Sequence, residues 1–160
     1  MPHLFNKTSK ISTVISIVLI FLLLGALGFL IYWLPDVTES LINATDNLGN
    51  RAEITDLGRK WVLIDAYVMV GVAVVAVVLM FFILRAVLLE RIFTIAATRL
   101  IGAVSLCCFL EGVLFAAIGV WFQLAFAAAI AACFVGLCLR VVKHVIEEAT
   151  RIKSENDFTI

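Results

Sequence analysis

One ionisable residue, Glu111, lies in the middle of the most apolar part of the chain. The forty residues Leu100–Leu139 hold only two strongly polar side chains, Glu111 and Gln123. A carboxylate at the centre of a bilayer costs about 2.5–3.5 kcal/mol even on insertion scales, so we expect it to be protonated, paired or turned toward a polar interior. Two interpretations stay open. Glu111 is either a proton, cation or ligand site, or a neutral carboxyl that donates a hydrogen bond to Ser105 or a backbone carbonyl of a neighbouring helix.

The other residues that could do chemistry are scattered. Asp65 lies one turn inside the second apolar run, where a carboxylate still reaches interfacial water, so we assign it a structural role. His3 and His144 lie in terminal segments, and neither has a partner at ligand spacing. The four cysteines sit inside apolar runs, as packing residues do: Cys107, Cys108, Cys133 and Cys138. We therefore predict no catalytic residue, no metal site and no cofactor, and we expect a protein that is not an enzyme.

The composition predicts an integral membrane protein. Of the 160 residues, 64% are hydrophobic, and the mean hydropathy is +1.15, which is more apolar surface than a soluble domain of this size can bury. Twelve basic and twelve acidic residues balance. Because the basic residues form no patch, we expect no direct binding of nucleic acid.

The apolar runs predict an all-α, polytopic fold in a single domain with four transmembrane helices. A crossing needs about 20 apolar residues. The expected crossings are about 11–34, 61–84, 97–122 and 124–139. We expect Pro35 to end the first helix and 36–60 to form an extracytoplasmic loop, either a solvated connector or a short surface helix that ends at Gly49. The segment Arg85–Arg99 predicts helix ends and an amphipathic piece on the membrane surface.

The charge distribution predicts the orientation. A cytoplasmic N-terminus places nine of the twelve basic residues on the inner side, as the positive-inside rule expects. Trp33, Trp61 and Trp121 then line the outer interface as an aromatic belt. Both termini are therefore expected in the cytoplasm, with the chain in a bacterial inner membrane.

Small residues predict where the helices approach closely, because helix association in lipid depends on contact. Candidate ridges are Gly25 and Gly28 on the first helix, Gly112, Ala116 and Gly119 on the third, and Ala128, Ala132 and Gly136 on the fourth. We expect the Glu111 face to point into the bundle against a helix with small residues. Whether these ridges serve one chain or a homo-oligomer stays open.

The segment 140–160 predicts a helix that leaves the membrane with one apolar side. Val145 and Ile152 are two turns apart, and Glu147 is spaced to pair with Lys143 and Arg151. The apolar side needs a cover: the membrane surface, the segment 87–95 or another protein.

The last residues carry a resemblance to a known family. The chain resembles the bacterial membrane family catalogued as domain of unknown function 2975, whose C-terminal helix closes in a Glu-x-Asp-Leu-Thr-Ile-like signature. The corresponding residues here are Glu155, Asp157, Phe158, Thr159 and Ile160, with Phe158 in the place of Leu. The resemblance implies four crossings and a polar segment after the first. Members are often encoded beside small helix-turn-helix regulators, which implies a cytoplasmic face that holds a transcription regulator.

Three functions follow as hypotheses. The first is a binding protein whose tail docks a soluble cytoplasmic regulator, through Val145, Ile152 and the terminal signature; Phe158 and Ile160 are then alternate anchors of an extended strand. The second is a small transporter or channel subunit that uses Glu111. The third is a structural subunit of a membrane complex.

Overall fold

The computed structural model describes residues 2–47, 55–89 and 94–157, with side chains described in 15–44, 55–89 and 94–152. These residues form four helices and no strand. The helices are α1 (Pro2–Asn47), α2 (Asp56–Leu88), α3 (Ile95–Ile118) and α4 (Gln123–Asp157). Each helix is long and apolar enough to cross a membrane. The predicted all-α architecture with four membrane-spanning helices is therefore confirmed.

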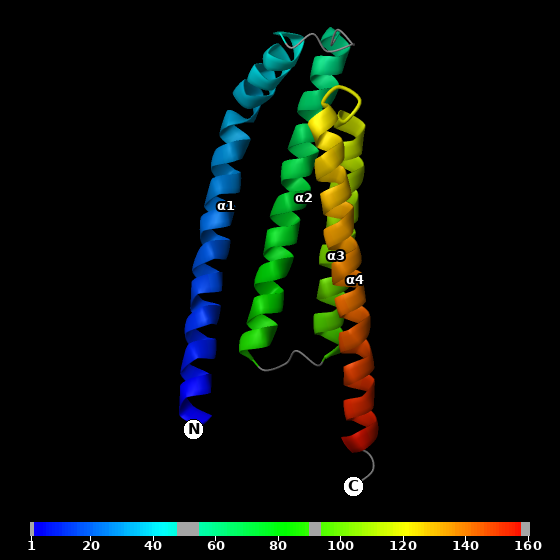
Figure 1. Ribbon diagram of the computed structural model, residues 1–160. Coiled ribbons are helices and arrows are strands. Elements are labelled where there is room, and N and C mark those ends of the chain that lie inside the picture. Colours follow the sequence, from blue (N-terminus) through cyan, green and yellow to red (C-terminus); the bar gives the residue numbers. More distant parts are fainter. Residues whose placement is uncertain (1, 48–54, 90–93, 158–160) are drawn as a thin grey trace.

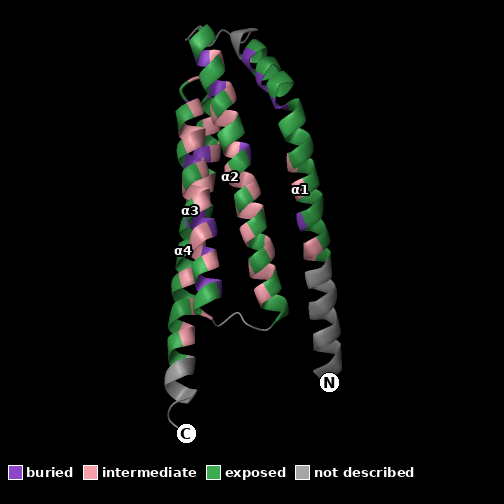
Figure 2. Cartoon of the chain, turned by 180° about the vertical axis from the view of Figure 1, so that it is seen from behind, coloured by how far each residue is buried: buried purple, intermediate pink, exposed green. Residues whose placement is uncertain are grey.

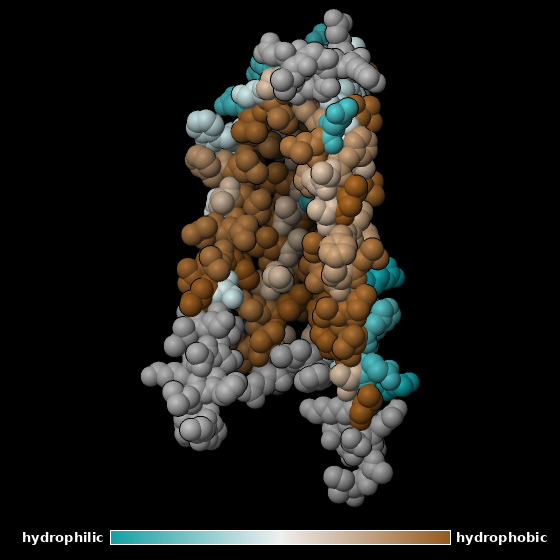
Figure 3. Space-filling view, in the orientation of Figure 1, coloured by the Kyte–Doolittle hydropathy of each residue, from teal (hydrophilic) through white to brown (hydrophobic). Residues whose placement is uncertain are grey.

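The helices form an up-and-down row in which each one packs against its neighbour in the chain (Figure 1). Both termini lie at one end of the bundle, which we call the termini end. The turn between α3 and α4 lies at the other end, which we call the turn end. Few side chains are buried (Figure 2). Hydrophobic side chains cover the middle of the molecule, and hydrophilic ones show near the turn end and along the outer side of the lower part of α4 (Figure 3). This surface is what a helical protein exposes to lipid.

Helix α1 does not end at Pro35, and this prediction was wrong. The helix continues to Asn47 and bends toward α2 in its last third (Figure 1). A proline removes the donor to the carbonyl four residues earlier, here Ile31, and bends a helix, and a Thr hydroxyl that bonds a carbonyl three or four residues earlier also bends it. Here the buried Thr38 hydroxyl donates to the carbonyls of Leu34 at 2.5 Å and Pro35 at 3.0 Å. The helix therefore bends at the proline and does not stop.

Most of the polar segment 36–60 that the structure describes is helical. It completes α1 and starts α2 at Asp56, five residues before the predicted crossing. The hydroxyl oxygen of Thr55 accepts a 3.3 Å hydrogen bond from the Gly58 amide and caps α2. Ile42 packs here with Val62 and Phe122 in a small core at the turn end. The surface-helix alternative therefore fits better than a solvated connector, although the helix continues α1.

Helices α3 and α4 are joined by a tight turn. Helix α3 ends at Ile118, four residues earlier than the predicted crossing, because the amides of Trp121 and Phe122 bond back to the Ile118 carbonyl at 2.9 and 3.0 Å. At the termini end, the Thr94 hydroxyl accepts a 3.3 Å bond from the Ala97 amide and caps α3. Helix α4 is one unbroken helix that contains both the predicted crossing and the predicted C-terminal helix.

Close helix packing was predicted at small residues of three helices, and it is found at glycines of α3 and α4 but not of α1. On α3, a Cβ at Gly112 would lie 2.6 Å from Cys133 Sγ, and one at Gly119 would lie 2.9 Å from the Phe126 ring. A Cβ at Gly136 on α4 would lie 3.3 Å from Phe109. At Gly25 and Gly28 of α1, by contrast, a Cβ would meet nothing within 4 Å. Close packing therefore joins α3 to α4, and the expected glycine contact of α1 is absent from the part of the chain that the structure describes.

Candidate functional site

The structure brings a second carboxyl to Glu111. Asp65 on α2 lies within range of an electrostatic interaction with Glu111 on α3, although no hydrogen bond joins the two carboxyls. Both side chains are half-buried, but Asp65 Oδ2 and Glu111 Oε1 are fully buried, and neither accepts or donates a hydrogen bond. Two carboxylates in such a setting repel each other and lack solvation. The arrangement suits carboxyls that carry a proton or hold a cation.

A cavity leads from the turn end toward this pair. It has a volume of about 200 Å³ and is lined by Trp61, Val62, Asp65, Ala117, Ile118 and Trp121. Asp65 lines the cavity, whereas Glu111 lies about two turns of α3 deeper than Ile118. Asp65 therefore lies at the cavity, and Glu111 lies deeper in the bundle than the part of α3 that lines it.

Glu111 does not bond to Ser105, which was one of its predicted partners. The Ser105 hydroxyl donates to the carbonyl oxygen of Gly136 on α4 at 2.8 Å. The adjacent Gly112 contacts α4. Because successive residues of a helix are about 100° apart, the Glu111 side chain leaves α3 in a different direction from that contact.

The remaining nucleophiles and potential metal ligands form no cluster in the described part of the chain. No group of three or more His, Cys, Asp or Glu side chains there is arranged to hold a metal ion. The four cysteines are free thiols. The candidate chemistry of the described residues is therefore that of the Asp65–Glu111 pair.

The second candidate site is the part of α4 beyond Leu139, which we call the α4 extension (residues 140–157). Val145 is 63% exposed and Ile152 is 52% exposed. Lys143 lies against Gly102 of α3, and at about 100° per residue Val145 and Ile152 are about 200° and 180° around the helix from Lys143. We call Val145 and Ile152 the docking face. It points away from α3.

Other predicted residues of the tail are only partly described. Glu155 and Asp157 belong to the last turns of α4, so the helix reaches the terminal signature. Phe158, Thr159 and Ile160 lie outside the described residues, and the strand-like anchoring predicted for them stays a prediction.

Ion pairs on the polar side of the extension stabilise its helical form. Lys143 Nζ lies 3.3 Å from Glu147 Oε1, which confirms one of the two predicted pairs. Arg151 Nη2 lies 2.6 Å from Glu148 Oε1, a pair that the sequence analysis did not include. Exposed pairs of this kind contribute a few tenths of a kcal/mol each, about 0.3–0.5.

Comparison with known families agrees with this architecture. Residues 34–160 match the family described as "Protein of unknown function (DUF2975)". The chain belongs to the DUF2975 family. The match confirms the predicted resemblance, and its range includes the bend of α1, all of α2 to α4 and the terminal signature of this DUF2975 protein. No curated protein and no solved structure matches the chain.

Sequence reasoning missed the functional potential of Asp65. One signal was available: Asp65 and Glu111 both lie on the membrane side of a tryptophan predicted at the outer interface, Trp61 and Trp121 respectively. Two antiparallel helices that start and end at one interface bring such residues to similar depths. Only the rotation of α2 against α3 decides whether they face each other, and periodicity alone does not predict that rotation.

Proposed function

We propose that this DUF2975 protein is a non-enzymatic membrane protein that holds a soluble cytoplasmic partner through the α4 extension and the terminal signature. One observation carries the proposal. The docking face is apolar, exposed and turned away from α3 on a helix that continues beyond the bundle (Figure 1). An apolar helix face presented to water favours a partner that lays its own apolar groove against it.

The position of Ile152 argues for a soluble cover over a lipid one. Ile152 follows Arg140 by twelve residues, or about 18 Å along a helix. The polar headgroup region on each side of the hydrocarbon is about 5–8 Å thick. If Arg140 marks the membrane surface, Ile152 stands in the aqueous phase.

The chemistry of the partner follows from its expected location. The positive-inside rule places the α4 extension in the cytoplasm, and the family resemblance implies a small helix-turn-helix transcription regulator. Because α4 is continuous from the membrane to the tail, a movement of α4 within the bundle also moves the docking face. Retaining such a regulator at the membrane would keep it from its DNA.

A capture experiment with truncated and substituted chains tests this proposal. The full-length chain, a chain that ends at Asn156, and the variants Val145→Lys and Ile152→Lys are isolated from native membranes in mild detergent. Retained soluble proteins are identified by mass spectrometry. We expect one small DNA-binding protein on the full-length chain and at least a tenfold loss of it in the other three.

The matched control is His144→Lys. His144 is 69% exposed next to the docking face, so this variant adds the same lysine without changing an apolar contact, and we expect it to capture the partner normally. Equal capture by the full-length chain and the Asn156 truncation would refute a role for the tail. Absence of any soluble protein from all samples would refute the function.

A second function, that of a proton-linked carrier or channel subunit, is favoured by the Asp65–Glu111 pair. The pair offers two fully buried carboxylate oxygens with no hydrogen-bond partner beside a cavity that reaches toward the turn end. Carboxyls within transmembrane segments form proton relays in pumps and transporters.

Proton flux into liposomes that contain a pH-sensitive dye tests this second function. We expect Glu111→Gln and Asp65→Asn each to abolish flux, and Glu147→Gln, which removes an exposed carboxyl, to leave flux unchanged. Normal flux in both intramembrane variants, or no flux in the unmodified chain, would contradict it.

A further inference from the structure

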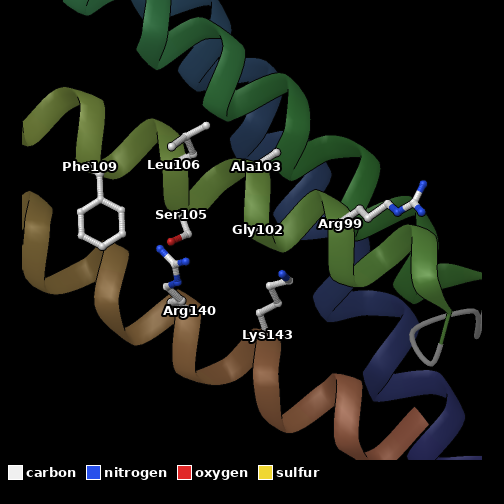
Figure 4. Close-up of a pocket in the computed structure, with 8 residues that line it drawn as sticks. All are labelled: Arg99, Gly102, Ala103, Ser105, Leu106, Phe109, Arg140 and Lys143. Carbon is white, nitrogen blue, oxygen red and sulfur yellow. The ribbon is translucent and has the colours of Figure 1, made fainter. Parts of the chain in front are cut away.

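A basic pocket opens between α3 and α4 near the termini end. It has a volume of about 360 Å³. Its lining includes three basic residues, Arg99, Arg140 and Lys143, and three uncharged ones, Ser105, Leu106 and Phe109. Arg140 and Lys143 extend from α4 toward α3, with Ser105 opposite Arg140, while Arg99 extends away from them at the rim (Figure 4).

Local packing explains why this pocket exists. A Cβ at Gly102 would lie 3.3 Å from Lys143 Cδ, so glycine leaves room for the aliphatic part of the lysine against α3. One turn further along α3, the hydrogen bond from Ser105 to Gly136 holds the helices together. The helices are therefore tied at one side of the pocket, and long basic side chains occupy the other side.

The pocket carries excess positive charge. No acidic residue lines it. Lys143 pairs with Glu147, which also lies 3.5 Å from His144 Nδ1. Within the described ranges, no carboxylate lies within ion-pair distance of Arg99 or Arg140, so two guanidinium groups have free donors. Guanidinium groups bind phosphate oxygens with paired, charge-assisted hydrogen bonds.

The depth of the pocket matches the edge of the bilayer. Arg140 and Lys143 follow the first residue of α4 by 17 and 20 residues, which is about 26–30 Å along the helix. The hydrocarbon layer is about 30 Å thick. The basic groups thus lie at the level of lipid phosphates. Leu106, which is 69% exposed, and Phe109 follow Arg99 along α3 into the membrane.

We propose that this pocket binds the phosphate group of an anionic phospholipid, with an acyl chain along Leu106 and Phe109. The guanidinium of Arg140 and the ammonium of Lys143 contact the phosphate, and Arg99 closes the rim. Basic pockets between transmembrane helices at a membrane surface have the charge and shape to bind such headgroups. The apolar wall below the basic groups favours a lipid over free phosphate, because inorganic phosphate has no apolar part that could contact this wall.

Lipid titration of the purified full chain tests the proposal. The chain in maltoside detergent is titrated with dioleoyl phosphatidylglycerol, with dioleoyl phosphatidylcholine and with inorganic phosphate, and bound molecules are counted by native mass spectrometry. We expect phosphatidylglycerol to bind at least tenfold more tightly than phosphatidylcholine. Arg140→Gln should weaken phosphatidylglycerol binding about fivefold, and Arg140→Lys should weaken it less than twofold.

Arg85→Gln is the matched control, because Arg85 lies in the last turn of α2 at the same end but does not line the pocket. It should change the affinity less than twofold. Lys143→Gln provides a second pocket variant if Arg140→Gln fails to fold. Equal binding of the two lipids, or equal losses in Arg85→Gln and the pocket variants, would overturn the proposal. Tight binding of inorganic phosphate that displaces the lipid would overturn the lipid assignment.

Discussion

The Ser105 hydroxyl on α3 donates a 2.8 Å hydrogen bond to the carbonyl oxygen of Gly136 on α4. Ser105 is only 3% exposed, and the Phe109 ring lies against the same glycine. This bond and the glycines on either side of it set the register of the closest helix pair. This register places Arg140 and Lys143 beside α3. It also determines that the α4 extension begins near the termini end of the bundle.

Removing this hydrogen bond should loosen the α3–α4 pair. We expect Ser105→Ala to lower the free energy of unfolding in detergent by about 1 kcal/mol, the upper range for hydrogen bonds between membrane helices. Thr150→Ala is the control, because the Thr150 hydroxyl bonds within its own helix to Ile146 at 2.7 Å. Equal destabilisation by the two substitutions would show that the Ser105 bond does not join the helices.

The glycine contacts predict opposite results at two positions. Gly112→Ala brings a Cβ to 2.6 Å from Cys133 Sγ and 3.3 Å from the Ala129 carbonyl oxygen, so it should destabilise the bundle by about 1–3 kcal/mol. Gly28→Ala meets open space and replaces a glycine inside a helix, so it should leave stability unchanged or raise it by up to about 1 kcal/mol. Adding Cys133→Ala to Gly112→Ala should recover most of the loss. Equal effects of the two glycine substitutions on detergent unfolding would contradict the packing described for α3 and α4.

The facing carboxyls predict energetic coupling across α2 and α3. Glu111→Gln removes one of the two interacting charges from an environment with little solvation, so we expect a gain of about 1 kcal/mol in unfolding free energy. Asp65→Asn should give a similar gain. The gain of the double variant should be smaller than the sum of the two single gains by at least about 0.5 kcal/mol. Thermal or denaturant unfolding of the four chains completes this double-mutant cycle. Additive single effects would mean that the carboxyls do not interact.

The bend at Pro35 predicts a distance change between α1 and α2. The bend carries Ile42 onto Val62 and Phe122, so a straighter α1 in Pro35→Ala should move Ile42 away from α2. Disulfide cross-linking of Ile42→Cys with Val62→Cys, in a background where Ser replaces the native cysteines, measures this separation. We expect cross-linking to fall at least threefold in the presence of Pro35→Ala. Unchanged cross-linking would mean that side-chain packing alone, and not the bend at Pro35, brings the end of α1 close to α2.

Hydropathy and length were sufficient to predict the architecture. Apolar runs of 20 or more residues determine four helices because lipid offers the backbone no other partner. The same reasoning failed at Pro35, because a proline inside a long apolar helix can bend the helix without ending it, and the Thr38 hydroxyl bonds two carbonyls of this bend. It also failed at Gly25 and Gly28, because a small residue permits close packing but does not require it.

The candidate sites were harder to predict from the sequence than the architecture was. Glu111 was found because it is the only acid in a forty-residue run, but its partner Asp65 depends on how α2 is rotated. The basic pocket was missed although the turn near Phe122 brings Arg99 to about the level of Lys143. Counting residues outward from that turn predicts that Arg99 and Lys143 lie at a similar depth. Whether a pocket opens between them depends on the packing at Gly102 and Ser105.

Contact between the docking face of α4 and a soluble protein can be measured by photo-crosslinking. The most direct measurement places a photoreactive amino acid at position 152, or at position 144 as the control, in the chain expressed in its native cells, and identifies the adducts after irradiation. We expect a protein adduct with one small cytoplasmic DNA-binding protein at position 152 and at least tenfold less of it at position 144. Adducts only with lipid, only with a second copy of the chain, or with no protein at position 152 would contradict it.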